Sequence, residues 1–318
     1  MIEARGLTKR YGATTAVNDI SFTVEPGQVT GFLGPNGAGK STTMRMIVGL
    51  DRPTAGHVTV NGKPYAQHKA PLREVGALLE AKAVHTGRSA TNHLRALAAT
   101  HGIGRKRVDE VIEMTGLTAV ARKRAGGFSL GMGQRLGIAS AMLGDPRTLI
   151  LDEPVNGLDP DGVRWVRTMV RYLADEGRTV FLSSHLMSEM AITADQLIVI
   201  GRGRIVATGD VQEVIDSVTK STVRVRTPQA TDLAARLQAE GVTVTSVEPS
   251  LLDVDGLSAP EVGAAALAAG IVLHELTPQS ASLEDAFMNL TAGDVEFHSG
   301  AVPEHQVDET AVSEGANR

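Results

Sequence analysis

The chain has 318 residues, of which 42% are hydrophobic and 21% charged, a composition typical of globular proteins and a length sufficient for roughly two domains. The formal net charge is −5, so the chain lacks the basic excess that neutralises phosphates, and no nucleic-acid partner is expected. It contains no cysteine, which excludes disulfides, cysteine metal sites and cysteine nucleophiles. No segment approaches the roughly 18 uninterrupted apolar residues of a membrane helix, which predicts a soluble cytoplasmic chain.

The first elements alternate between strand and helix. A strand is predicted over 17–24, a short apolar strand over 29–33, and a helix from 42 to about 50 after a glycine-rich loop. Later apolar runs are short and continuous, as expected for strands buried on both faces of a parallel sheet; they occupy 148–151, 179–182 and 197–200. Because helical segments lie between them, the pattern predicts an α/β core.

Two regions depart from this alternation. Residues 89–145 are predicted to form an inserted helical subdomain within a first domain that spans 1–218. A smaller α/β domain follows over 219–292. Its predicted strands are an edge-like strand around 223–225 and strands at 242–247, 251–255 and 271–276, with helices near 229–240, 259–269 and 282–291. The acidic tail over 293–318 is expected to be disordered.

The glycine-rich loop carries a complete phosphate-binding pattern, formed by Gly34, Pro35, Asn36, Gly37, Ala38, Gly39, Lys40 and Ser41. Glycines allow consecutive backbone N–H groups to turn toward phosphate oxygens. Lys40 is expected to contact the β- and γ-phosphates, and the Ser41 hydroxyl to ligate Mg²⁺. A chance glycine turn before a helix is the alternative, but the preceding strand and the following helix favour a P-loop that binds a nucleotide.

A second signal lies at the end of the apolar run over 148–151, where Asp152 and Glu153 follow directly. Two carboxylates at a buried strand end are costly unless they are used. Asp152 is expected to hold Mg²⁺, and Glu153 to polarise the attacking water. Two exposed acids at a strand terminus are the alternative, which the complete P-loop disfavours.

These features lead to a resemblance over residues 1 to about 218. Phe128–Arg135 (Phe-Ser-Leu-Gly-Met-Gly-Gln-Arg) resembles the signature motif of the ATP-binding subunits of ABC transporters. Asn156–Pro160 is similar to their dimer-interface loop, and Ser183–His185 to their switch-histidine motif. Tyr11 stands where the family stacks an aromatic ring on adenine, although it could be a half-buried surface ring.

The resemblance implies a fold of the P-loop NTPase class with a β-rich N-terminal part, and a homodimer that traps two ATP molecules. Ser129 and Gly131 of one chain would contact the γ-phosphate held by the other, and Thr42 would complete the ATP site. His185 would hydrogen-bond the γ-phosphate and the attacking water beside Glu153. The dimer interface is expected to include Gly133, Gln134 and Asp159.

Two departures from the usual motifs indicate which branch of the family the chain resembles. Glu80 stands where a glutamine usually reaches Mg²⁺ and the transmembrane partner, and an ionised carboxylate donates no hydrogen bond. The signature has Leu130 and Met132 where Gly and Gln are usual. Both departures, and the segment 280–287, resemble ATPases of drug- and antibiotic-exporters such as those for daunorubicin and bacitracin resistance.

The sequence therefore predicts the ATP-hydrolysing subunit of an exporter of a drug, antibiotic or lipid-like substrate. It would lie peripherally on the cytoplasmic side of a bacterial membrane, beneath separately encoded membrane permease subunits. An importer subunit is one alternative, which Glu80 and the segment 280–287 disfavour. A soluble ABC ATPase acting on ribosomes or DNA is another, disfavoured by the single P-loop. A regulator without turnover is disfavoured by Glu153 and His185.

Overall fold

The computed structural model describes residues 1–80, 84–218, 222–239 and 241–279. The helix predicted at 282–291 and the acidic tail lie outside the described residues. In the described part of the chain, none of the helices combines the length and the apolar character needed to cross a bilayer.

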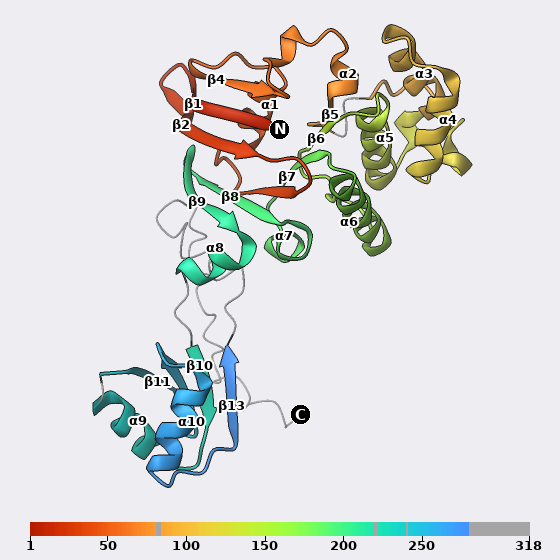
Figure 1. Cartoon of the computed structure of the whole chain (residues 1–318). Helices are drawn as coiled ribbons and strands as arrows, with labels where there is room; N and C mark the ends of the chain where they lie inside the picture. Colours follow the sequence, from red (N-terminus) through yellow and green to blue (C-terminus); the bar gives the residue numbers. More distant parts are fainter. Residues whose placement is uncertain (81–83, 219–221, 240, 280–318) are drawn as a thin grey trace, which may run out of the picture.

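A six-stranded sheet forms the centre of the N-terminal part (Figure 1). Its order is β5 (Val75–Leu78), β6 (Thr148–Leu151), β7 (Thr179–Ser184), β3 (Val29–Leu33), β8 (Gln196–Gly201) and β9 (Arg204–Asp210). Neighbouring strands are parallel except for β9, which pairs antiparallel with β8 at the edge. Every residue of β3, β6 and β7 is buried, which confirms the continuous apolar runs as interior parallel strands.

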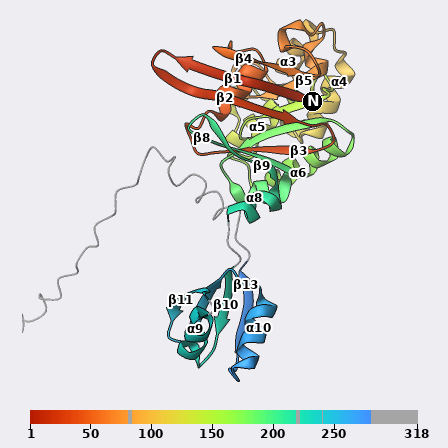
Figure 2. The ribbon, with the colours of Figure 1, turned by 60° about the vertical axis from the view of Figure 1, so that its left-hand side comes forward.

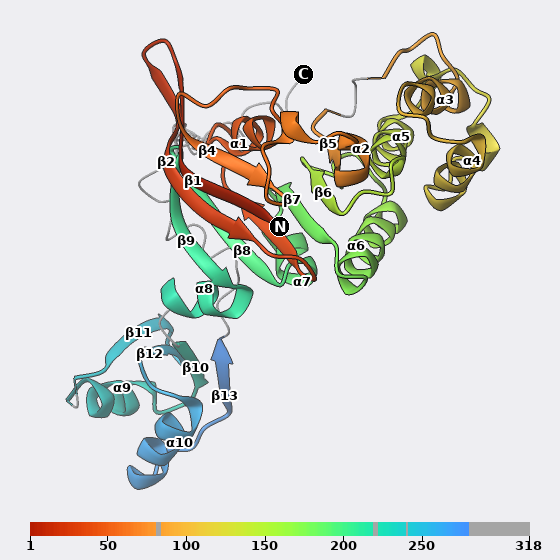
Figure 3. The same cartoon turned by 45° about the horizontal axis from the view of Figure 1, so that its top comes forward.

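A second, antiparallel sheet packs against one face of the first. Its order is β2 (Thr14–Val24), β1 (Ile2–Tyr11) and β4 (Ala55–Val60), of which only β2 was predicted individually. Helix α1 (Lys40–Ile47) shares the same hydrophobic core. The rings of Phe22, Phe32 and Phe181 meet there, with centroids 5.2–6.0 Å apart. Figure 3 shows the two sheets with α1 beside them.

The opposite face of the six-stranded sheet is covered by helices. A second core joins its strands to α5 (Leu130–Met142), α6 (Pro160–Asp175), α7 (Met187–Thr193) and α8 (Val211–Val218). Helix α5 also packs against α3 (Ala90–Thr100) and α4 (Arg105–Met114). Residues 89–145, all of which the structure describes, contain no strand, as the sequence predicted for this region. The four-residue α2 (Pro71–Glu74) precedes β5.

The described residues after 221 form an antiparallel sheet with its own core (Figure 2). The chain order is β10 (Thr222–Arg226), α9 (Ala230–Ala239), β11 (Thr243–Glu248), β12 (Leu251–Asp255), α10 (Ala259–Ala268) and β13 (Glu275–Gln279). The strand order β11-β12-β10-β13 gives a ferredoxin-like β-α-β-β-α-β unit. Both helices contribute to the same core as Val223 and Val225, so they cover one face of the sheet.

The last strand of this unit differs from the prediction of 271–276. Residues 270 and 271 still close α10, because the N–H of Gly270 binds the Leu267 carbonyl and that of Ile271 binds the Ala266 carbonyl. Pairing with β10 therefore starts only near residue 274, and β13 runs over Glu275–Gln279. Pro278 is tolerated in this strand because β13 lies at the edge of the sheet.

Candidate functional site

The glycine-rich loop joins the buried end of β3 to the start of α1. Gly37 and Gly39 adopt φ values of +84° and +107°, which side chains rarely tolerate. A Cβ at Gly34 would lie 2.4 Å from the carbonyl oxygen of Ile200, and one at Gly39 would lie 2.6 Å from that of Ala16. The loop therefore requires glycine at these positions, as the P-loop pattern predicts.

Lys40, the first residue of α1, is buried within the loop that precedes it. Its Nζ donates to the carbonyl oxygens of Gly34 at 2.6 Å and Pro35 at 3.2 Å. Burial lowers the pKa of Lys40, and the nearby carboxylates of Glu153 and Asp152 oppose this effect. The Lys40 ammonium thus lies in a site that favours additional negative charge.

Asp152 and Glu153 follow β6 and are fixed by Ser183 of the adjacent strand β7. The Ser183 hydroxyl donates to Asp152 Oδ1 and accepts the backbone N–H of Glu153 at 3.0 Å. Ser183 had no individual role predicted from sequence, although a polar residue at the end of an apolar run, as here in β7, is a signal for one. Glu153 itself has φ +49°, a left-handed backbone that costs about 1–3 kcal/mol and is concentrated at functional sites.

The Glu153 side chain lies between two cationic or proton-carrying groups. Its Oε1 is 3.9 Å from Lys40 Nζ, and its Oε2 is 2.7 Å from Nδ1 of His185, which follows β7. The Glu153 carbonyl accepts from Nε2 of Gln134 at 2.9 Å. Gln134 is buried in its own chain, and its expected place in a dimer interface stays a prediction.

An open hollow of about 200 Å³ lies over this arrangement. It is lined by Ala16, Pro35, Asn36, Gly37, Gly39, Lys40, Ser41, Thr42, Asp152 and Glu153. The predicted phosphate loop and the predicted acidic pair therefore meet at the carboxyl ends of β3 and β6, where α/β sheets bind ligands.

Tyr11 and Glu80 lie outside the set of described residues that line this hollow. Tyr11 ends β1 and is 48% exposed; its hydroxyl donates to Asp51 Oδ2 at 2.9 Å. Glu80 is exposed, two residues beyond the end of β5. Their expected contacts with adenine and Mg²⁺ stay predictions.

The predicted signature and interface loops cap two helices. Ser129 is the N-cap of α5, and its Oγ accepts the N–H of Met132 at 3.2 Å. Asp159 is the N-cap of α6 and accepts the N–H of Gly162 at 2.9 Å. Gly133 donates its N–H to the Ser129 carbonyl at 2.9 Å. Like Gly131, these residues lie outside the described lining of the hollow.

The two loops contact each other through Leu130. A Cβ at Gly131 would approach the Gly157 carbonyl to 3.1 Å, and a Cβ at Gly157 would lie 2.2 Å from Leu130 Cδ2. Gly157 also has φ +75°. The unusual leucine in the signature stretch therefore occupies the space that a side chain at 157 would need.

Gly157→Ala is therefore expected to destabilise the chain by about 1–3 kcal/mol, from overlap with Leu130 and from the positive φ. Urea denaturation measures this loss. In the Leu130→Gly background the same change should cost less, because only the backbone strain remains. An equal cost in both backgrounds would exclude the Leu130 contact as a cause.

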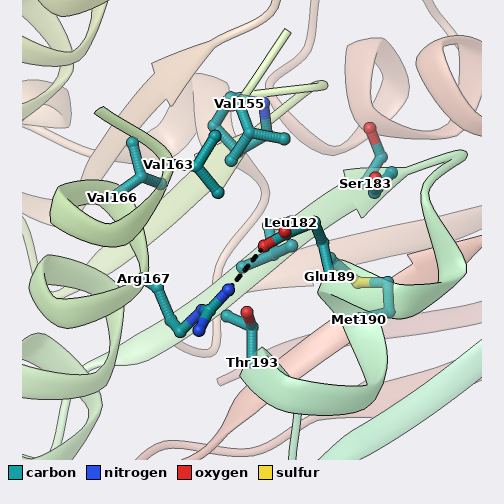
Figure 4. Close-up of a pocket in the computed structure, with 11 residues that line it drawn as sticks. Val155, Val163, Val166, Arg167, Leu182, Ser183, Glu189, Met190 and Thr193 are labelled. Carbon is teal, nitrogen blue, oxygen red and sulfur yellow. Dashed lines mark hydrogen bonds and ion pairs between the residues drawn. The ribbon is translucent and has the colours of Figure 1, made fainter. Parts of the chain in front are cut away.

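A second hollow lies between α6, α7 and the end of β7, and Figure 4 shows its side chains. Most of its lining is aliphatic, including Val155, Val163, Val166, Leu182 and Met190. Arg167 Nη2 donates to Glu189 Oε2 at 3.0 Å across it, which ties α6 to the helix that follows His185. The free volume of this second hollow, about 10 Å³, is too small for a triphosphate, whereas the hollow over Lys40 is larger and carries the phosphate loop.

Comparisons with known proteins agree with this geometry. The family described as ABC transporter matches residues 17–156, and a domain of unknown function, DUF8746, matches residues 221–284. The bacitracin transport ATP-binding protein BcrA of Bacillus licheniformis is 42% identical over 208 residues, which cover 64% of this chain and 68% of that protein. The linearmycin resistance ATP-binding protein LnrL of Bacillus subtilis is 33% identical over 305 residues, which cover 92% of this chain and 98% of that protein.

A solved structure of an ATP-binding subunit of an ABC transporter superposes with a TM-score of 0.63 at 26% identity, over 68% of this chain and 92% of that one. The shared fold, the relatives and the P-loop beside an acidic pair agree on one assignment. The chain belongs to the ATP-binding, ATP-hydrolysing subunits of ABC transporters.

Proposed function

We propose that two copies of this chain bind two ATP molecules between them and power export through separately encoded membrane subunits. The dimer is supported by the way in which the predicted ATP site is divided into two separate parts of the chain. Lys40, Asp152 and Glu153 line one hollow, whereas Ser129 and Gly131 lie outside its described lining. A second chain placed head to tail would bring its Ser129 hydroxyl and the N-terminus of its α5 to the γ-phosphate.

The groups of each chain then act on the phosphates and on water. The P-loop N–H groups and Lys40 bind the β- and γ-phosphates, and Glu153 accepts the proton of the attacking water. Its 2.7 Å contact with His185 orients the carboxylate and leaves the imidazole to hydrogen-bond the γ-phosphate. The water oxygen bonds to the γ-phosphorus as the bond to ADP breaks, which gives ADP and phosphate. Catalysis is chiefly positioning and charge stabilisation.

Mg²⁺ fits the oxygen donors that this hollow presents. Ser41 and Asp152 both line it, and hydroxyl and carboxylate oxygens suit a hard cation. When bound there, Mg²⁺ supplies charge that neutralises the phosphate oxygens. Ser183 orients the Asp152 carboxylate toward this role through its hydrogen bond to Oδ1.

The names of the relatives support export of an antibiotic. BcrA is described as a bacitracin transport protein and LnrL as a linearmycin resistance protein. The same reasoning supports a position on the cytoplasmic face of a bacterial membrane, against membrane subunits. The similarity to LnrL extends over 92% of this chain, so it includes the unit after residue 221. We assign this unit to dimerisation or to docking on the membrane subunits.

The export function predicts that the encoding bacterium loses resistance when turnover stops. Replacing the chromosomal copy with Glu153→Gln should lower the minimal inhibitory concentration of at least one antibiotic in a panel that includes bacitracin. Glu110→Gln, a surface acid on α4, is the matched control and should leave resistance intact. Unchanged resistance across the panel, combined with loss of uptake of a nutrient, would favour the importer alternative.

A further inference from the structure

Tyr11 is linked to the P-loop helix by a short polar chain. Its hydroxyl donates to Asp51 Oδ2 at 2.9 Å, and the same oxygen accepts from Arg45 Nε at 2.8 Å. Arg45 lies on α1, which begins at Lys40. The ring at the end of β1 is thus connected to the helix that presents the phosphate-binding lysine.

The other contacts of Tyr11 leave its ring available on one side. Lys9 Nζ lies 4.9 Å from the ring centroid and donates to the Arg52 carbonyl at 2.8 Å, which places an ammonium over one face. The residue as a whole nevertheless remains 48% exposed. A planar base therefore has a free surface on which to stack.

The hydroxyl of Tyr11 is held as a donor. Burial raises the pKa of Tyr11 and the hydrogen bond to Asp51 raises it further, while the Arg45 guanidinium and the Thr42 hydroxyl oppose this. The Arg45 guanidinium holds the pKa of Asp51 below its usual value, so the carboxylate stays charged and accepts both bonds at neutral pH.

We propose that Asp51 is a positioning residue that fixes the Tyr11 ring, relative to α1, for stacking on the base of the bound nucleotide. This inference rests on the proposed ATP site and deepens it by naming a residue that sets recognition of the base. Without the carboxylate, the Tyr11 ring loses one of the contacts that fix its orientation, and more of its motion must be ordered when nucleotide binds.

The test separates binding of the base from binding of the phosphates. Calorimetry on the full chain compares ATP with inorganic tripolyphosphate, which has no base. Asp51→Ala and Tyr11→Phe should each weaken ATP binding about two- to tenfold, the effect of losing one hydrogen bond. The double variant should be no worse than Asp51→Ala alone, because the Tyr11–Asp51 bond that Tyr11→Phe removes is already lost in Asp51→Ala. Affinity for tripolyphosphate should not change in any of them.

Tyr172→Phe is the matched control, because the Tyr172 hydroxyl on α6 also bonds a carboxylate, that of Glu176. It should leave both affinities unchanged. Unchanged ATP affinity in Asp51→Ala, or equal losses for ATP and tripolyphosphate, would overturn the positioning role.

The proposed phosphate site is tested separately. Lys40→Ala should weaken the binding of both ATP and tripolyphosphate, whether or not Asp51 positions Tyr11. If Tyr11→Ala leaves ATP affinity unchanged while Lys40→Ala lowers it, the phosphate site stands and the positioning role of Asp51 is excluded.

Discussion

Steady-state ATP hydrolysis by Glu153→Gln is expected to fall at least about a hundredfold, the usual effect of removing a general base. The amide has nearly the same shape, so the contact with His185 and the left-handed backbone at 153 should persist. What is lost is the proton acceptor for water and the charge 3.9 Å from Lys40 Nζ. ATP binding should therefore be retained, as calorimetry with the variant can measure.

The control is Glu110→Gln, which alters a half-exposed acid on α4 that pairs with Lys106 and Arg107. Its turnover should equal that of the unaltered chain. Turnover at the unaltered rate in Glu153→Gln would instead exclude Glu153 as the group that activates water.

Lys40→Ala should act one step earlier, on binding. The variant loses the cation that meets the β- and γ-phosphates, a charge-assisted contact worth about 1.5–3 kcal/mol, which corresponds to roughly ten- to a hundredfold in ATP affinity. It also loses the bonds from Nζ to the Gly34 and Pro35 carbonyls, so the empty loop should be less ordered. Calorimetric titration with ATP measures the change.

Lys106→Ala is the matched lysine, because its side chain is 93% exposed on α4. It should bind ATP as the unaltered chain does. Equal ATP affinity in Lys40→Ala and Lys106→Ala would refute the phosphate-binding role of the loop.

The parts of this molecule that could be predicted from sequence are those with a local physical signature. Continuous apolar runs predicted β3, β6 and most of β7 and β8, because a strand buried on both faces has no polar alternation. The P-loop and the Asp152–Glu153 pair could be placed together because parallel strands end at one edge of a sheet. The structure brings them to a single hollow.

Other features depend on contacts between distant segments and left no local signal. The residues that pair between the antiparallel strands β1 and β4 lie 47 to 58 positions apart in the sequence, and neither strand was predicted individually. The start of β13 was predicted too early because residues 270 and 271 still bond to α10. Asp51 resembles an ordinary loop acid until the fold places it between Tyr11 and Arg45.

We propose that two chains trap ATP between the P-loop of one and the Ser129 loop of the other, until Glu153 permits hydrolysis. Light scattering of Glu153→Gln with ATP and Mg²⁺ tests this proposal. We expect the mass of a dimer with ATP and of a monomer without nucleotide, and a return to monomer in the same variant when Ser129 is also changed to Arg. A monomer at saturating ATP, or a dimer that the Ser129 change does not affect, would contradict it.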